Sequence, residues 1–74
     1  MVTEELDATG LKCPLPVLKT RKRLKALSPG DILIVKSTDP GSPLDMKAFC
    51  EQHGHDLESE EEGDCLFRFT IRKA

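Results

Sequence analysis

The 74-residue sequence predicts an α/β fold, with a four-stranded mixed sheet and two helices on one face. Residues 14–27 and 42–53 each begin at or beside a proline and carry apolar residues at helical spacing. Residues 32–36 begin with four consecutive aliphatic residues, and residues 67–72 alternate apolar and polar residues with the period of a strand. Because so short a chain buries little surface, we expect one domain over residues 1–74 without a deep enzymatic cleft.

The first half of the chain predicts a strand, a helix and a second strand. Residues 4–8 form the first strand, and the helix is expected to run from Pro14 to about residue 27. Its inward sector should contain Val17, Leu24 and Leu27. The aliphatic strand at 32–36 is expected to be buried on both faces, inside the sheet, and parallel to the first strand across a right-handed crossover.

The second half predicts a helix followed by two strands. Ser42 offers a capping hydroxyl for the helix over 42–53. The inward stripe of this helix should consist of Met46, Phe49, Cys50 and His53. Residues 55–62 predict an edge strand whose acidic residues discourage pairing with other chains, and residues 67–72 predict a half-buried strand beside it.

Cys13 is the strongest candidate for a functional residue. It stands directly before Pro14 and Pro16, which stiffen the chain at the start of the first helix and fix the direction of the sulfur. A helix N-terminus carries about half a positive charge, so we expect the pKa of this thiol to be lowered, with Lys12 adding to the effect. The alternative is a small buried hydrophobic residue. A proline-flanked helix start favours an exposed nucleophile.

A motif of the form Gly-x-x-Cys-Pro-x-Pro is made by Gly10, Cys13, Pro14 and Pro16. It lies within LDATGLKCPLPVLKTRKRL and is followed in order by PGDILIV, DPGSPLD, AFC and FRFTIRK. In these segments, from about Leu6 to Lys73, the chain resembles the TusA-like (SirA-like) family of small sulfur carriers. The resemblance implies a compact βαβαββ two-layer sandwich. Some relatives have an acidic residue where this chain has Leu15, which bears on the choice of partner.

The resemblance also implies a function. Cys13 would accept sulfur as a persulfide from a cysteine desulfurase or similar donor protein and pass it to an acceptor protein. The destinations are tRNA 2-thiouridine synthesis, sulfur oxidation and molybdenum cofactor supply, and the sequence does not choose among them. Such a protein is a component of a sulfurtransferase relay rather than a stand-alone enzyme, and it needs no cofactor of its own.

The basic residues near Cys13 are candidates for docking on partner proteins. Net charge is −2, but residues 1–37 hold seven Lys and Arg against four Asp and Glu, whereas residues 38–74 hold four against nine. This asymmetry suits charge-guided docking on proteins. The docking candidates are Lys12, Lys19, Arg21, Lys22, Arg23 and Lys25. A merely solvated helix face is the alternative.

Two other functions remain open. A small RNA-binding module would use the basic helix, but three Phe residues provide no stacking platform, so direct nucleic-acid binding is not expected. A thiol-based redox regulator would use Cys13 as a sensor. The sequence has no leader-like start, no apolar run near 18 residues and no paired cysteine spacing. We therefore predict a cytoplasmic protein without a membrane segment. We also expect a monomer.

The remaining cysteines and histidines are weaker candidates. Cys50 is expected in the core, with a second redox thiol as the alternative, and Cys65 has no activating neighbour. A zinc site would need Cys50, His53, His55 and Cys65, whose spacing matches no common zinc motif. We therefore predict no metal site.

Overall fold

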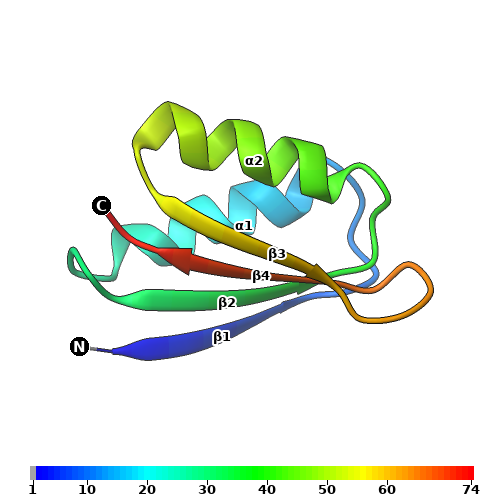
Figure 1. Cartoon of the computed structure of the whole chain (residues 1–74), viewed down its shortest axis with the longest axis horizontal. Helices are drawn as coiled ribbons and strands as arrows, with labels where there is room; N and C mark the ends of the chain where they lie inside the picture. The colour runs from blue at the N-terminus through cyan, green and yellow to red at the C-terminus, as the bar shows by residue number, and fades with distance from the viewer. Residues whose placement is uncertain (1) are drawn as a thin grey trace.

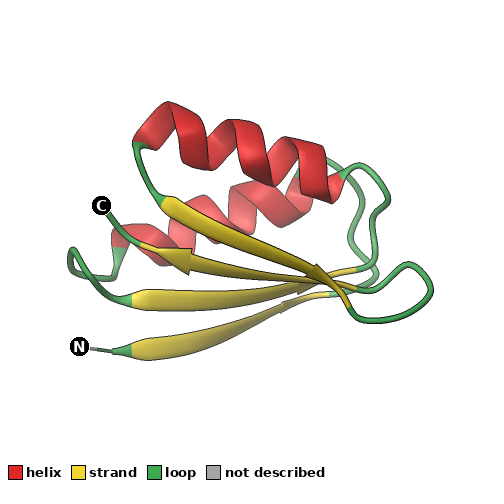
Figure 2. Cartoon of the chain, viewed as in Figure 1, coloured by secondary structure: helices red, strands yellow, loops and turns green. Residues whose placement is uncertain are grey.

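The computed structural model describes residues 2–74. Its elements are β1 (Thr3–Ala8), α1 (Leu15–Lys25), β2 (Ile32–Ser37), α2 (Ser42–His53), β3 (Asp56–Glu61) and β4 (Phe67–Arg72). The strands form one sheet in the order β1-β2-β4-β3, with β1 parallel to β2 and the other neighbours antiparallel (Figure 1). Both helices cover the same face (Figure 2). The predicted βαβαββ two-layer sandwich is confirmed.

The core lies between the sheet and the two helices. Its largest fully buried apolar side chains come from β2, α2 and β4, and they are Leu33, Val35, Met46, Phe69 and Ile71. β1 adds Leu6 and Ala8 to this layer. β1, β2 and β4 thus each contribute alternate residues to one face, as the period of a strand requires.

β2 is internal, as predicted, but it is buried on one face only. Leu33 and Val35 are completely buried, whereas Ile32 and Ile34 are half-exposed. The reason is that, within residues 2–74, both helices lie on the first face of the sheet and leave the second face open (Figure 2). The prediction of burial on both faces was wrong, because a continuous aliphatic run also suits a central strand of a sheet with one open face.

α1 is shorter than predicted at both ends. Pro14 is the N-cap rather than the first helical residue, and Pro16 occupies the second helical position, where a missing N–H costs no hydrogen bond. The helix ends at Lys25, yet Leu27 stays buried after it. The buried side of this segment therefore continues beyond the end of the helix.

Thr20 lies on the buried stripe of α1 between Pro16 and Leu24. Its hydroxyl donates to the carbonyl of Pro16 at 2.8 Å. This bond satisfies the polar group and allows a threonine to fill a core position. Val17, which was predicted for the stripe, is only half-buried.

α2 spans the predicted residues, with two corrections. Ser42 is the first helical residue and not a cap, since its hydroxyl donates to the carbonyl of Asp39 at 2.6 Å. Phe49 and Cys50 are buried as predicted. His53, the last residue of the helix, is exposed, and its ring packs on that of Phe49 with centroids 4.8 Å apart.

β3 forms an edge of the sheet, as predicted, because it pairs only with β4. Its side chains are exposed except for the half-buried Leu57. The acidic residues thus line an edge that discourages pairing with another chain.

Within residues 2–74, neither helix has the length and apolar character that crossing a membrane requires.

Candidate functional site

The site is formed by the loops that follow β1 and β2. These strands are parallel and in register up to Ala8 and Ser37, so their carboxyl ends meet at one edge of the sheet. The backbone N–H of Gly10 donates to the hydroxyl of Thr38 at 2.8 Å and ties the two loops together. Gly10 has φ +79°, a left-handed conformation that glycine adopts without steric penalty. The motif glycine therefore shapes the approach to Cys13.

Cys13 lies in the loop before α1 and is exposed, as predicted. The Cys13–Pro14 peptide bond is cis. The first backbone N–H of the helix does not donate a hydrogen bond to the sulfur of Cys13, because the N–H of Leu15 donates to the carbonyl of Lys12 at 2.9 Å. This N-terminal amide is thus already occupied and does not stabilise a thiolate at Cys13.

The thiol of Cys13 instead meets a carboxylate. Its Sγ donates to Oδ2 of Asp45 at 2.6 Å. This hydrogen bond raises the pKa of the Cys13 thiol above its usual value, and partial desolvation and the negative charges of Asp45 and Asp39 act in the same direction. The predicted lowering of this pKa was wrong, because the hydrogen bond to Asp45 favours the protonated form of the thiol.

Asp39 completes a group of three polar side chains. Sγ of Cys13 and one carboxylate oxygen each from Asp39 and Asp45 all lie within 4.8 Å of one another. The Oδ2 atom of Asp39 is buried and has no hydrogen-bond partner among the described residues. Within this group, the 2.6 Å contact between Sγ of Cys13 and Oδ2 of Asp45 is a hydrogen bond.

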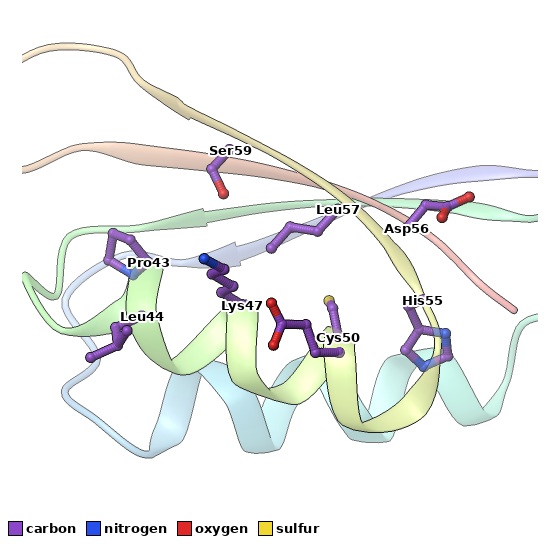
Figure 3. A pocket seen from close by; sticks show the side chains of 9 residues that line it. Pro43, Leu44, Lys47, Cys50, His55, Asp56, Leu57 and Ser59 are labelled. Carbon is purple, nitrogen blue, oxygen red and sulfur yellow. The ribbon is translucent and has the colours of Figure 1, made fainter.

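The four side chains considered from the sequence as zinc ligands take no part in this group. Cys50 is buried, with 1% of its surface exposed, and burial raises the pKa of its thiol to about 11. Its sulfur points toward β3 in a groove between that strand and α2 (Figure 3). Cys65 is exposed in the loop between β3 and β4. The predicted core position of Cys50 is confirmed.

A groove of about 460 Å³ between α1 and α2 runs from Cys13 along both helices. Leu18 and Arg21 line it from α1, and Asp45 and Phe49 line it from α2. Leu18 is 49% exposed. The thiol thus stands at the end of an open groove with both apolar and charged walls.

Leu15, the residue between the two prolines, is 47% exposed. Together with Leu18 it places apolar surface beside the thiol on α1. Exposed apolar side chains grouped at a functional site are typical of protein contact surfaces.

The predicted basic docking surface divides into two sides. Arg21 lines the groove of Cys13. Lys19, Lys22 and Arg23 line a separate groove with Leu6 of β1. Arg23 also forms an ion pair with Glu4, with Nη1 and Oε1 3.1 Å apart. The remaining docking candidates, Lys12 and Lys25, are exposed.

Asp45 and Asp39 were not identified from the sequence as neighbours of Cys13, although a usable signal exists. Two parallel strands joined by a helix place their following loops at the same edge of the sheet. Cys13 follows the first of these strands, and the two acids follow the second. The order of strands and helices in the sequence does not indicate the direction in which each side chain points.

Comparison with known proteins places this geometry in a family. Residues 4–73 match the sequence profile of the family described as sulfurtransferase TusA. The chain is 53% identical over 72 residues to the sulfur carrier protein TusA of Allochromatium vinosum, covering 96% of this chain and 93% of that protein. It is 47% identical over 72 residues to a putative sulfur carrier protein of Neisseria meningitidis serogroup A, covering 97% of each.

A solved structure agrees. The crystal structure of a SirA-like protein from Desulfitobacterium hafniense superposes with a TM-score of 0.84 at 26% identity, covering 93% of this chain and 95% of that chain. Fold, motif order and sequence identity point the same way, and the chain belongs to the TusA family of sulfurtransferases and sulfur carriers.

Proposed function

We propose that this protein carries sulfur as a persulfide on Cys13. The observation that carries the proposal is the place of this thiol: exposed, in the family's motif, at the end of a groove that a partner protein can reach. Cys50 is buried in the core, and Cys65 lies in a different loop. Membership of the TusA family supports the same role.

The transfer is an exchange of one sulfur–sulfur bond for another. The thiolate of Cys13 attacks the terminal sulfur of a persulfide on the donor, R–S–SH, and a new bond forms to Sγ while the R–S bond to that sulfur breaks. The donor leaves as a thiolate and takes the proton that Cys13 gave up. The products are Cys13–S–SH and R–SH, so no external oxidant or reductant is needed.

The donor in this proposal is a pyridoxal-phosphate cysteine desulfurase, and the acceptor is a protein cysteine that attacks Cys13–S–SH in the same manner. The destination in this proposal is either synthesis of 2-thiouridine in tRNA or other sulfur trafficking. The open groove and the exposed Leu15 and Leu18 support a protein partner rather than a small substrate, because a shallow groove encloses little of a small molecule.

The RNA-binding alternative finds no support in the side chains of the described residues. Phe49 and Phe69 are buried, Phe67 is half-buried, and the exposed ring of His53 packs on Phe49, so these rings form no open platform for stacking on bases. A redox regulator would also use Cys13, and the experiment below separates it from a carrier because a sensor gains no sulfur from a desulfurase.

The test is sulfur loading followed by intact mass measurement. Wild type, Cys13→Ser and Cys65→Ser are incubated with a cysteine desulfurase and cysteine. We expect wild type and Cys65→Ser to gain one sulfur atom and Cys13→Ser to gain none. A Cys13→Ser protein that still gains sulfur would show that the assignment of Cys13 is wrong.

A further inference from the structure

The hydrogen bond between Cys13 and Asp45 joins two elements that are 32 residues apart in the chain. The thiol is the donor, because an ionised carboxylate only accepts hydrogen bonds. Asp45 is fixed independently of the sulfur: it lies in the first turn of α2, where its backbone N–H donates to the carbonyl of Gly41 at 3.1 Å. The sulfur is therefore held by a group whose place the fold determines.

The charges around this sulfur are unequal. On the side of α2 and its preceding loop, Asp45 and Asp39 lie within 4.8 Å of it. Arg21 of α1 and His53 of α2 line the same groove, and Lys12 precedes Cys13 in the loop. The hydrogen bond to Asp45 does most to raise the pKa of the thiol, and partial desolvation and the charges of Asp45 and Asp39 raise it further. The environment therefore favours the protonated, hydrogen-bonded sulfur.

We propose that Asp45 distinguishes the empty carrier from the loaded one, holding the thiol of Cys13 through this hydrogen bond and releasing the sulfur once a persulfide has formed. The inference rests on the proposed function. In Cys13–S–SH the Sγ atom is bonded to Cβ and to the terminal sulfur, so it carries no hydrogen and cannot donate to Oδ2. The bond that holds the empty sulfur is therefore lost on loading.

Loading also adds a repulsion. The terminal sulfur extends one S–S bond, about 2.05 Å, beyond Sγ. Once ionised, it carries a negative charge close to the carboxylate of Asp45, and like charges at that distance repel. The loaded sulfur turns away from α2 toward the open end of the groove, where an acceptor cysteine can reach it. The empty thiol stays protonated, which protects it from oxidants and other electrophiles because the thiolate is the reactive form.

The test measures the rate of alkylation of Cys13 by iodoacetamide against pH, peptide by peptide, in wild type, Asp45→Asn and Glu51→Gln. Glu51 is exposed on the same helix and serves as a matched loss of one negative charge. We expect the midpoint for Cys13 to fall in Asp45→Asn only. Each unit of fall gives ten times more thiolate and a less nucleophilic sulfur, a net gain of about threefold in rate at pH 7.

A second arm loads the same three proteins with inorganic polysulfide and measures alkylation of the persulfide. We expect Asp45→Asn not to raise this rate, because the loaded sulfur is no longer hydrogen-bonded to Asp45 and the charge of Asp45 only turns it outward. Equal thiol midpoints in wild type and Asp45→Asn, or equal effects of the substitution on thiol and persulfide, would overturn the proposal. If Asp45→Asn loses its far-ultraviolet circular dichroism spectrum, Asp45→Ser takes its place, with the same expectations.

The proposal and the proposed function fail separately. A Cys13 that takes no sulfur from a desulfurase contradicts the proposed function and leaves the thiol titration of Asp45→Asn intact. A Cys13 that loads normally, with a titration midpoint that does not respond to Asp45→Asn, contradicts the role of Asp45 alone.

Discussion

Cys13 combines two properties that oppose each other at the scale of the single residue. It is exposed at the end of a groove, yet it donates a hydrogen bond to Asp45, and the pKa of its thiol is raised. A carrier benefits from both, because an exposed sulfur can meet its partner and a protonated thiol reacts slowly with everything else. Partner docking then has to separate the thiol from the carboxylate.

The two motif prolines are expected to act differently when replaced. Pro14 is exposed before α1, so Pro14→Ala should keep the fold of wild type while loosening the segment and slowing sulfur transfer. Pro16 is buried, so Pro16→Ala should lower the free energy of unfolding by about 1 kcal/mol. Urea denaturation and the rate of sulfur transfer measure the two effects. Transfer at the wild-type rate in Pro14→Ala would contradict a role of this proline in presenting the sulfur.

The sequence predicts Cys13 as the functional thiol because the two prolines beside it constrain the chain locally. Asp45 was not identified, since its role depends on the rotamer of the thiol and on the angle at which α2 leaves the preceding loop. The direction of the pKa shift at Cys13 was wrong for the same reason. Local pattern predicts a candidate thiol, but the electrostatic environment of that thiol is a tertiary property.

At the scale of elements, the side chain of Asp31 stabilises the turn between α1 and β2 through hydrogen bonds. Its carboxylate accepts the backbone N–H of Ser28 at 2.8 Å and that of Val2 at 3.0 Å. These bonds, that of Ser28 first, lower the pKa of Asp31. One carboxylate thus connects the end of the first helix with the start of the first strand.

Acid should remove this contribution to stability. The pKa of Asp31 is depressed in the folded state, so its stabilisation is complete above the unfolded value of about 3.9 and is lost as pH falls through the folded value. We expect Asp31→Asn to be less stable than wild type at pH 7 and the gap to shrink below pH 4, as measured by urea denaturation. A gap that stays constant down to pH 2.5 would contradict this linkage.

Element order and type followed from periodicity and from proline and glycine signals, and all six elements are present. The errors concern ends and faces. Leu27 lies outside α1 although it has helical spacing, and the cap of α2 is Gly41 although Ser42 has the preferred side chain. Such details depend on tertiary hydrogen bonds, here from Ser42 to the carbonyl of Asp39.

At the scale of the whole molecule, the basic charge on α1 does not form a single surface. Arg21 lines the groove of Cys13, whereas Lys22 and Arg23 line a groove beside β1. Arg21 is therefore the better candidate for guiding a partner onto the thiol. Within residues 2–74, Arg21 takes part in no ion pair, so its charge is available to a partner.

Reversal of this charge should slow sulfur transfer. We expect Arg21→Glu to reduce the transfer rate from a desulfurase about threefold to tenfold at low ionic strength, and the loss should shrink near 0.15 M salt. Lys47→Glu is the matched control, since Lys47 is exposed on α2 and lines the groove on the β3 side. Equal rates and equal salt dependence in Arg21→Glu and wild type would favour a merely solvated helix face.

The central claim is that sulfur on Cys13 can be passed on, and the most direct test is return transfer. Carrier loaded with ³⁵S is separated from the desulfurase and mixed with fresh desulfurase without cysteine. The transfer exchanges one sulfur–sulfur bond for another and can run in either direction. We therefore expect label to leave the Cys13 peptide and to appear on the desulfurase. Label that stays on the carrier, or that leaves from a peptide other than that of Cys13, would contradict the claim.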